Sequence, residues 1–355
     1  MRVCLIASSR FPVREPFQGG LEAHTAMLAE RLIARGHQVS LFAAPGSDHR
    51  LNVEELEVGT FEPSAAARQD VGAPPRQWMQ EHHAYLQLML ELIATGADRF
   101  DVVHNNSLHH LPVAMASAVD VPMVSSLHTP PLAWLESAMV LAGRDVTFTA
   151  VSEHTARAWA HAVDAAVVLN GVDTDRWAAG PGGERAVWTG RLVPEKAPHL
   201  AIRAARAAGI DVVLAGARLD PGYFEHKIAP LLGPHVEYAG HLSNRELSEV
   251  VGGSAVAIVS PAWDEPYGLV AAEAMSCGTP VAAFARGALP EIVSSDGGRL
   301  AAPGDVEALA DAVREAGALD RGRVRSHAVE HLGIDPMVDG YERVYAGVAH
   351  GVAAA

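Results

Sequence analysis

Short apolar runs alternate with helical patterns along the whole chain, and this alternation limits the fold more than any other feature of the sequence. The runs at residues 3–7, 39–42, 101–104 and 122–127 have the length and apolar content of buried strands. Residues 21–35, between the first two runs, show apolar side chains at helical spacing. A strand, a helix and another strand in this order predict a parallel sheet with helices on both faces.

The same alternation begins again after residue 170 and predicts a second domain of the same kind. A Gly-rich tract at residues 178–183 is the best linker candidate. We therefore predict an α/β protein with two Rossmann-like domains, 1–169 and 170–336, that face each other across a cleft. A last helix, 337–355, is expected to cross back to the first domain. Further expected elements are strands at 145–151, 165–169, 186–189, 212–215, 236–238, 255–259 and 281–284, helices at 77–93, 198–208, 244–251, 306–316 and 324–331, and a turn at 297–298.

The net charge and the cysteine content limit the possible binding partners and the cellular compartment. The 355 residues carry a formal net charge of −15, which argues against binding to nucleic acid or to an anionic membrane. The two cysteines, Cys4 and Cys277, fall in predicted core elements, so we expect reduced thiols and a cytoplasmic protein. The apolar N-terminal run is too short for a signal peptide or a membrane anchor.

The stretch 260–281 carries the clearest chemical signal. A helix is expected to start near Gly268, and the N–H groups of Gly268, Leu269 and Val270 then have no intrahelical partner, which favours an anion such as phosphate. Glu265 and Glu273 flank this helix start. A carboxylate repels phosphate, so we expect both acids to face neutral hydroxyl groups. An anion site between two hydroxyl-binding acids is typical of a site for a sugar nucleotide.

Two cations, Arg191 and Lys196, follow the first strand of the second domain. Side chains just beyond the carboxyl end of a strand point into the ligand crevice of an open α/β sheet. Arginine can hold phosphate oxygens in a bidentate manner, and lysine supplies a point charge. The alternative is a surface ion pair between Lys196 and Glu195 or an aspartate at a helix start.

Gly19, Gly20 and His128 are weaker candidates. The glycine pair precedes the first helix and would allow a ligand to approach the backbone closely, although an ordinary β-to-α loop explains it equally well. His128 ends a strand at the predicted ligand edge of the first sheet. It is a candidate to bridge the donor sugar and the acceptor, and a structural role is the alternative.

Two polar clusters look like metal sites only superficially. His104, His109 and His110 lack a cysteine or acid at ligand spacing, so we interpret them as solvated or on the acceptor side. Asp173 and Asp175 form a D-x-D triplet, but they follow an Asn-Gly turn at the expected domain junction. We therefore predict no required metal and no cofactor beyond a nucleotide-sugar co-substrate.

The segments 19–24 (GGLEAH), 169–173 (LNGVD), 190–196 (GRLVPEK) and 265–281 (EPYGLVAAEAMSCGTPV) resemble the family-4 retaining glycosyltransferases of the GT-B fold, also called glycosyl transferases group 1. The resemblance covers most of the chain, and the last segment is the most specific. It implies that Arg191 and Lys196 bind the donor diphosphate, that Glu273 binds the ribose, and that Glu265 binds the donor sugar.

The resemblance also implies that the glycine pair closes over the donor. The residues expected to take part in catalysis are Arg191, Lys196, Glu265 and His128. Those expected to contact the donor are Gly19, Gly20, Arg191, Lys196, Leu242, Glu265, Tyr267, Gly268, Leu269, Val270 and Glu273.

The expected reaction moves a hexose from a nucleotide-diphosphate sugar, with UDP favoured over GDP and ADP, to a hydroxyl of an acceptor. The helix at 77–93 contains acids but no lysine, which favours a small soluble acceptor over a lipid-linked one at an anionic membrane. A lipid-linked acceptor, a sugar-nucleotide 2-epimerase and a non-catalytic binding module remain as alternatives. A monomer or homodimer is expected.

Overall fold

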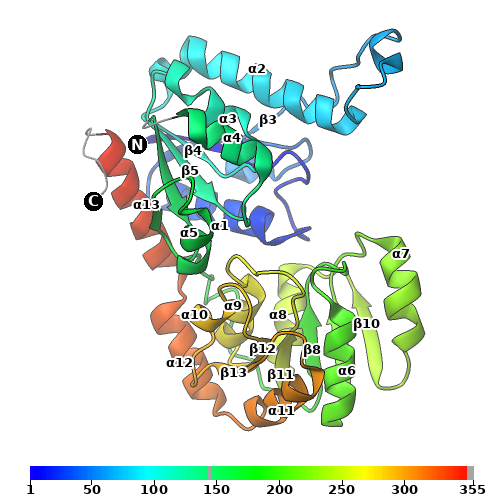
Figure 1. The fold of residues 1–355 in the computed structure, drawn as a ribbon. Coiled ribbons are helices and arrows are strands. Elements are labelled where there is room, and N and C mark those ends of the chain that lie inside the picture. The colour runs from blue at the N-terminus through cyan, green and yellow to red at the C-terminus, as the bar shows by residue number, and fades with distance from the viewer. Residues whose placement is uncertain (143–144, 350–355) are drawn as a thin grey trace.

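The computed structural model describes residues 1–142 and 145–349, which form two α/β domains built on parallel sheets (Figure 1). In the described part of the chain, the first sheet has the strand order β3-β2-β1-β4-β5-β6-β7. Its strands are β1 (Arg2–Ile6), β2 (Gln38–Ala43), β3 (Val53–Glu55), β4 (Val102–Asn105), β5 (Met123–Leu127), β6 (Val146–Ala150) and β7 (Ala165–Val167). The predicted parallel architecture is confirmed.

Helices cover both faces of this sheet, as the crossovers between parallel strands require. They are α1 (Gly20–Ala34), α2 (Arg76–Arg99), α3 (Leu111–Ala114), α4 (Ala133–Ala142) and α5 (Glu153–Trp159). Two apolar clusters fill the two faces. One packs α2, α3 and α4 against the sheet, and the other packs α1 and the C-terminal helix against it.

The second sheet has the order β10-β9-β8-β11-β12-β13 and is also parallel throughout. Its strands are β8 (Ala186–Thr189), β9 (Val212–Ala215), β10 (Val236–Gly240), β11 (Val256–Val259), β12 (Val281–Phe284) and β13 (Gly298–Ala301). Its helices are α6 (Pro198–Ala208), α7 (Pro221–Tyr223), α8 (Asn244–Gly252), α9 (Leu269–Ser276), α10 (Leu289–Ile292), α11 (Val306–Ala316) and α12 (Arg321–His331). The carboxyl ends of both sheets face the gap between the domains, so loops from both domains meet there (Figure 1).

Several elements differ from the sequence-based expectations, and helices α3, α4, α5, α7 and α10 were not predicted. Strand β3 was not predicted, and the turn expected at 297–298 is instead the start of strand β13. A Cβ on Gly298 would lie 2.1 Å from the carbonyl oxygen of Val281, so this glycine allows a strand to pack closely rather than a turn to form. Helix α2 continues six residues beyond the predicted end at 93, because Gly96 lies buried inside it against Val121.

The tract 178–183, predicted to be a linker, is packed against the second domain. The N–H groups of Gly180 and Gly182 donate to the carbonyl oxygens of Cys277 and Gly252, at 3.0 and 2.9 Å. A Cβ on Gly180 would lie only 2.3 Å from the Gly252 backbone. These glycines therefore allow two backbone segments to pack closely, and they do not form a flexible linker.

The chain passes between the domains at two neighbouring points. Val172 pairs with Gly333 in an isolated parallel bridge, and a Cβ on Gly171 would lie 2.5 Å from the Cα of Ile334. The two crossings lie side by side and run between the same two domains.

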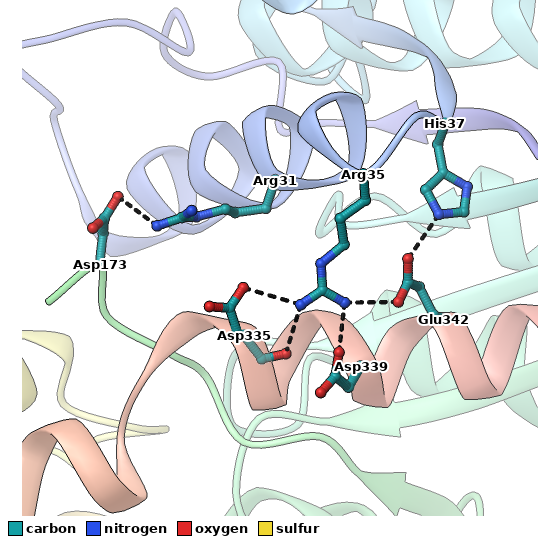
Figure 2. A network of polar contacts seen from close by, with 7 residues as sticks. All are labelled: Arg31, Arg35, His37, Asp173, Asp335, Asp339 and Glu342. Carbon is teal, nitrogen blue, oxygen red and sulfur yellow. Dashed lines mark hydrogen bonds and ion pairs between the residues drawn. The ribbon is translucent and has the colours of Figure 1, made fainter. Parts of the chain in front are cut away.

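Helix α13 (Ile334–Ala349) packs on the first domain, as predicted for the C-terminal helix; residues 350–355 of the predicted 337–355 lie outside the described part. Figure 2 shows the polar network that fastens it to α1. Arg35, the residue directly after α1, contacts the carboxylates of Asp335, Asp339 and Glu342 on α13, and His37 contacts Glu342 at 2.8 Å.

The structure also shows whether the cysteines and His104 are buried. Cys4 and Cys277 are fully buried and unbridged, in agreement with their predicted core positions. His104 is also fully buried, hydrogen-bonded to Tyr345 at 2.6 Å and to Ser126 at 2.7 Å, so the interpretation of His104 as solvated or on the acceptor side is wrong. Among the described residues, no helix combines the length and the apolar character that a membrane crossing requires.

Candidate active site

One cavity between the two domains is lined by every residue that the sequence nominated for the site. From the first domain these are Gly19, Gly20 and His128; from the second they are Arg191, Lys196, Leu242, Glu265, Tyr267, Gly268, Leu269, Val270 and Glu273. They come from loops at the carboxyl ends of the strands in both sheets, which is where ligands bind in open α/β folds. The cavity therefore brings cations, acids and a helix start together.

Lys196 and Glu265 form an ion pair in this cavity. The Lys196 ammonium lies 2.7 Å from one carboxylate oxygen of Glu265 and 2.6 Å from the other. Trp263 completes the group, because its indole N–H donates to Glu265 at 3.1 Å and its ring lies beneath the Lys196 ammonium. The alternative pairing of Lys196 with Glu195 is wrong; Glu195 instead lies 4.0 Å from Arg191.

The start of helix α9 is shaped by Gly268. This residue has φ +102°, a left-handed conformation that glycine tolerates best, and a Cβ there would lie 2.7 Å from Leu289. No acceptor for the N–H groups of Gly268, Leu269 or Val270 is found in the described parts of the chain. All three residues line the cavity, so the anion site expected there stays a prediction that these unpaired N–H groups allow.

The loop before this helix is held by the first domain. The Pro266 carbonyl oxygen accepts hydrogen bonds from the hydroxyls of Ser152 and Thr155, at 2.6 and 3.1 Å. Ser152 also caps helix α5 by accepting from the N–H of Thr155. Helix α5 of the first domain thus fixes the position of the α9 helix start in the second.

Glu273 lies in α9 and lines the same cavity. Within the described residues its carboxyl group has no hydrogen-bond partner. Burial raises its pKa from 4.5 to about 8. The residue is half-buried, and a carboxyl group without a partner in such a place is costly in its ionised form, so this group suits a ligand that donates hydroxyl hydrogen bonds to it.

The glycine pair of the first domain lies against the second domain. A Cβ on Gly20 would be 3.2 Å from a methyl group of Leu269, and one on Gly19 would be 3.9 Å from the Arg191 side chain. Leu269 packs against the cores of both domains. Larger residues at these two positions would push the domains apart or fill the cavity.

His128 lies at the carboxyl end of β5 and is held in place from two sides. Its Nε2 is 2.7 Å from the side-chain oxygen of Asn106, and its ring contacts the ring of His24 edge-on at 4.8 Å. Burial, together with the nearby His24 and His104, lowers the pKa of His128 well below its ordinary value. His128 is therefore a neutral imidazole that donates from Nε2 to Asn106.

Glu22, a residue that the sequence reasoning missed, also lines the cavity. It lies in the first turn of α1 and is almost fully buried. Burial raises its pKa to about 6, and the nearby Arg191 and Arg10 partly oppose this rise. In the sequence, only its position three residues after Gly19 indicated that Glu22 belongs to the site. Arg10 and Trp263, which also line the cavity, were missed as well.

The D-x-D triplet has a structural role. The Asp173 carboxylate lies 3.1 Å from Arg31 of α1 (Figure 2). It also accepts hydrogen bonds from the N–H groups of Asp175 and Arg176. Among the described residues, no group of three or more His, Cys, Asp or Glu side chains is arranged to hold a metal ion. The imidazoles of His109 and His110 take part in ring contacts beside the cavity.

Comparison with known proteins agrees with this geometry. The sequence model of a family described as "Glycosyl transferases group 1" matches residues 174–326, and that of "Glycosyltransferase Family 4" matches residues 18–176. Glycogen synthase of Mycobacterium tuberculosis is 29% identical over 88% of this chain and 85% of its own length. D-inositol 3-phosphate glycosyltransferase of Mycobacterium bovis is 28% identical over 92% of this chain and 78% of its own.

The fold is also found in solved structures. An Anabaena protein, crystallised in complex with UDP and glucose, superposes with a TM-score of 0.75 at 19% identity, covering 98% of this chain and 99% of its own. Such a likeness concerns the fold alone, and it identifies the two facing domains as the GT-B architecture.

Proposed function

Because the chain belongs to the group 1, family-4 glycosyltransferases of the GT-B fold, we propose that it transfers a hexose from a nucleotide-diphosphate sugar to a hydroxyl of a small soluble acceptor, with retention of configuration. UDP is the favoured nucleotide, and no metal ion or cofactor takes part. The observation that carries the proposal is the meeting of Arg191, Lys196, Glu265 and Glu273 at the start of α9.

Each part of the donor then has a matching group. Arg191, Lys196 and the free N–H groups at the start of α9 hold the diphosphate, because all of them stabilise negative charge. Glu273 accepts hydrogen bonds from the ribose hydroxyls. Glu265 accepts hydrogen bonds from the transferred sugar. The glycine pair lets the first domain close over the donor without a steric clash.

The proposed chemistry needs positioning and charge stabilisation more than a protein base. The bond from C1 of the sugar to the diphosphate breaks, the acceptor oxygen bonds to C1 from the same face, and the acceptor proton passes to a phosphate oxygen. Negative charge develops on the departing diphosphate, where Arg191 and Lys196 act. The neutral His128, whose Nε2 is hydrogen-bonded to Asn106, positions the ligand through Nδ1, which accepts a hydrogen bond from a hydroxyl of the sugar or of the acceptor.

Pairing between Lys196 and Glu265 supports separate roles for the two residues. A diphosphate that enters the cavity competes with Glu265 for the ammonium group. As the diphosphate draws Lys196 away, the Glu265 carboxylate becomes available to the sugar hydroxyls. Until the donor binds, the ion pair thereby neutralises the charges of the Lys196 ammonium and the Glu265 carboxylate, which are both largely buried.

A thermal-shift panel tests this proposal. UDP, GDP, ADP and their sugars are each added with and without EDTA, because a ligand that binds the folded state raises the melting temperature. We expect a clear stabilisation by one nucleotide that EDTA does not change. Absence of stabilisation by any nucleotide would contradict the proposal, and loss of stabilisation with EDTA would contradict metal independence.

Product analysis then separates transfer from its alternatives. NMR of the anomeric proton reports whether the product keeps the donor configuration. A sugar nucleotide converted to its C2 epimer without an acceptor would instead support a 2-epimerase. Transfer that occurs only to a lipid-linked acceptor in vesicles would contradict the small soluble acceptor.

A further inference from the structure

A group of aromatic and imidazole rings lies on the first domain beside the cavity. We call it the ring shelf and define it as Trp78, His82, His109, His110 and Trp134. The rings come from three separate places: α2, the loop between β4 and α3, and the start of α4. Their centroids form a continuous chain of contacts, from Trp78 to His82 at 5.1 Å, His82 to His110 at 5.9 Å and His110 to Trp134 at 5.4 Å.

The ring shelf adjoins a residue that lines the transfer cavity. His109 stacks on Tyr85 at 4.5 Å, and Leu108, the residue before it, lines the cavity. The Tyr85 hydroxyl donates to the Ala7 carbonyl at 2.8 Å and accepts from the N–H of Ser9 at 2.9 Å, at the carboxyl end of β1. The shelf is thereby fixed to the edge of the sheet where the acceptor would enter.

One member of the shelf faces solvent to an unusual extent for its size. Trp134 is 63% exposed, and the centroid of its ring lies 6.1 Å from that of the Trp78 ring. The folded chain gains little from a tryptophan in this position, because most of its apolar surface stays in water. A ligand that covers the ring would gain this contact.

Imidazoles give the shelf a polar character that an aliphatic patch lacks. The Nδ1 of His109 accepts from the N–H of Leu111 at 3.2 Å, so a neutral His109 carries its proton on Nε2. That N–H, and the Nδ1 of His82, have no partner in the described part of the chain. Both atoms are buried, so a ligand hydroxyl reaches them only when the neighbouring rings shift.

Charge argues for a neutral ligand. Burial lowers the pKa of His82, His109 and His110, so the imidazoles are uncharged at neutral pH. The cations of α2 are already paired, Arg76 with Glu62 and Arg99 with Glu54 and Glu91. Helix α4 contains no basic residue in its last turn and one acid, Glu136. A phosphorylated or acidic ligand would find no free cation in these elements.

We propose that the ring shelf binds the distal part of the acceptor, and that this acceptor is an uncharged carbohydrate of at least two sugar rings. One ring would enter the cavity to receive the hexose, while the next would lie on Trp134 and His110. Sugar rings have an apolar face that packs on an aromatic ring and edge hydroxyls that pair with imidazole nitrogens. This inference rests on the proposed function and specifies its acceptor.

The test uses the full chain on an array of neutral and acidic glycans, in the presence of the nucleotide diphosphate that stabilises it best. We expect binding to neutral glycans of two or more rings and not to acidic ones. W134A should weaken this binding about tenfold, and W134F should stay within about threefold of wild type, because a phenyl ring restores stacking.

L141A provides the matched control. Leu141 is 82% exposed on the same helix but takes no part in the ring shelf, so glycan binding should be unchanged. All variants should bind the nucleotide diphosphate as wild type does, because Trp134 does not line the cavity. Equal nucleotide binding by W134A also shows that the variant is folded.

Several outcomes would overturn the inference. These are an absence of neutral-glycan binding by wild type, a preference for acidic glycans, or equal glycan binding by W134A. Binding to phosphatidylcholine vesicles that depends on Trp134, without any glycan binding, would assign the shelf to a lipid surface instead. If the nucleotide binds and the glycans do not, only the shelf is wrong; if no nucleotide binds, the proposed function itself fails.

Discussion

The ammonium of Lys196 lies within 2.7 Å of both carboxylate oxygens of Glu265, so one contact joins the loop after β8 to the loop after β11. Both side chains are largely buried, at 22% and 11% exposure. The sequence suggested two independent ligand-binding residues. The structure shows that they neutralise each other, and a donor must therefore act on both.

Alanine variants should separate the two acids of the site. Glu265→Ala removes the competitor for Lys196, so affinity for the bare nucleotide diphosphate should stay the same or improve, while kcat falls by about 10²- to 10³-fold. Glu273→Ala should weaken nucleotide binding by about tenfold, because the hydrogen bonds that its carboxyl group accepts from the ribose hydroxyls are lost. Calorimetric titration and initial rates measure the two effects.

Glu195→Ala is the control for this pair. The Glu195 carboxylate lies 4.0 Å from Arg191, and Lys196 pairs with Glu265 instead, so the loss of Glu195 should change neither quantity by more than about twofold. Wild-type turnover by both the Glu265 and the Glu273 variant would refute the roles given to them.

Glu273 should make the stability of the protein depend on pH. Its pKa is raised from 4.5 to about 8 by burial, so the folded state prefers the protonated form. Its contribution is fully present below pH 4.5 and is lost as the pH rises toward 8. The free energy of unfolding of E273Q minus that of wild type should therefore rise by roughly 2–4 kcal/mol between pH 5 and pH 8. Urea unfolding at both pH values measures this; an unchanged difference would place the Glu273 carboxyl group in water.

Glu22 should weaken donor binding above pH 6. Its pKa is raised to about 6 by burial, so at pH 7.5 it adds a negative charge beside Arg191 and the diphosphate site. The ratio of the Kd of wild type to that of E22Q should be near one at pH 5 and rise to about three- to tenfold at pH 7.5. The ligand should be an intact nucleotide sugar, because its diphosphate does not titrate in this range. A ratio independent of pH would exclude Glu22 from the donor site.

Gly268→Ala should destabilise the protein and displace the start of α9. Alanine at this position would have to adopt φ +102°, and its Cβ would lie 2.7 Å from Leu289. The backbone strain and the close contact together should cost about 2–4 kcal/mol of stability. Gly304→Ala is the matched control, because Gly304 has φ +81° with nothing within 4 Å and should cost about 1 kcal/mol. Urea unfolding gives both values. Equal costs would mean that Leu289 yields freely and that the helix start tolerates a side chain.

Much of the fold was predictable because it follows from local patterns. Apolar runs, helical spacing and glycine stops located β8, α6, β9 and α11 at their observed bounds. The segment 265–281 likewise indicated the helix start and its flanking acids. Strand β3 has only three residues and β13 begins with a glycine, so neither carries a pattern strong enough to predict it.

The sequence by itself determined the two-domain α/β fold and indicated the two cations, the two acids and the helix start that line the cavity, because periodicity and strand ends are encoded over a few neighbouring positions. Only the tertiary structure decided that Lys196 pairs with Glu265, that Glu22 and Glu273 have raised pKa values, and that His104 lies in the core. These properties depend on distances and burial between elements far apart in the chain. The side chains that surround a charge, and not its neighbours in sequence, set its free energy.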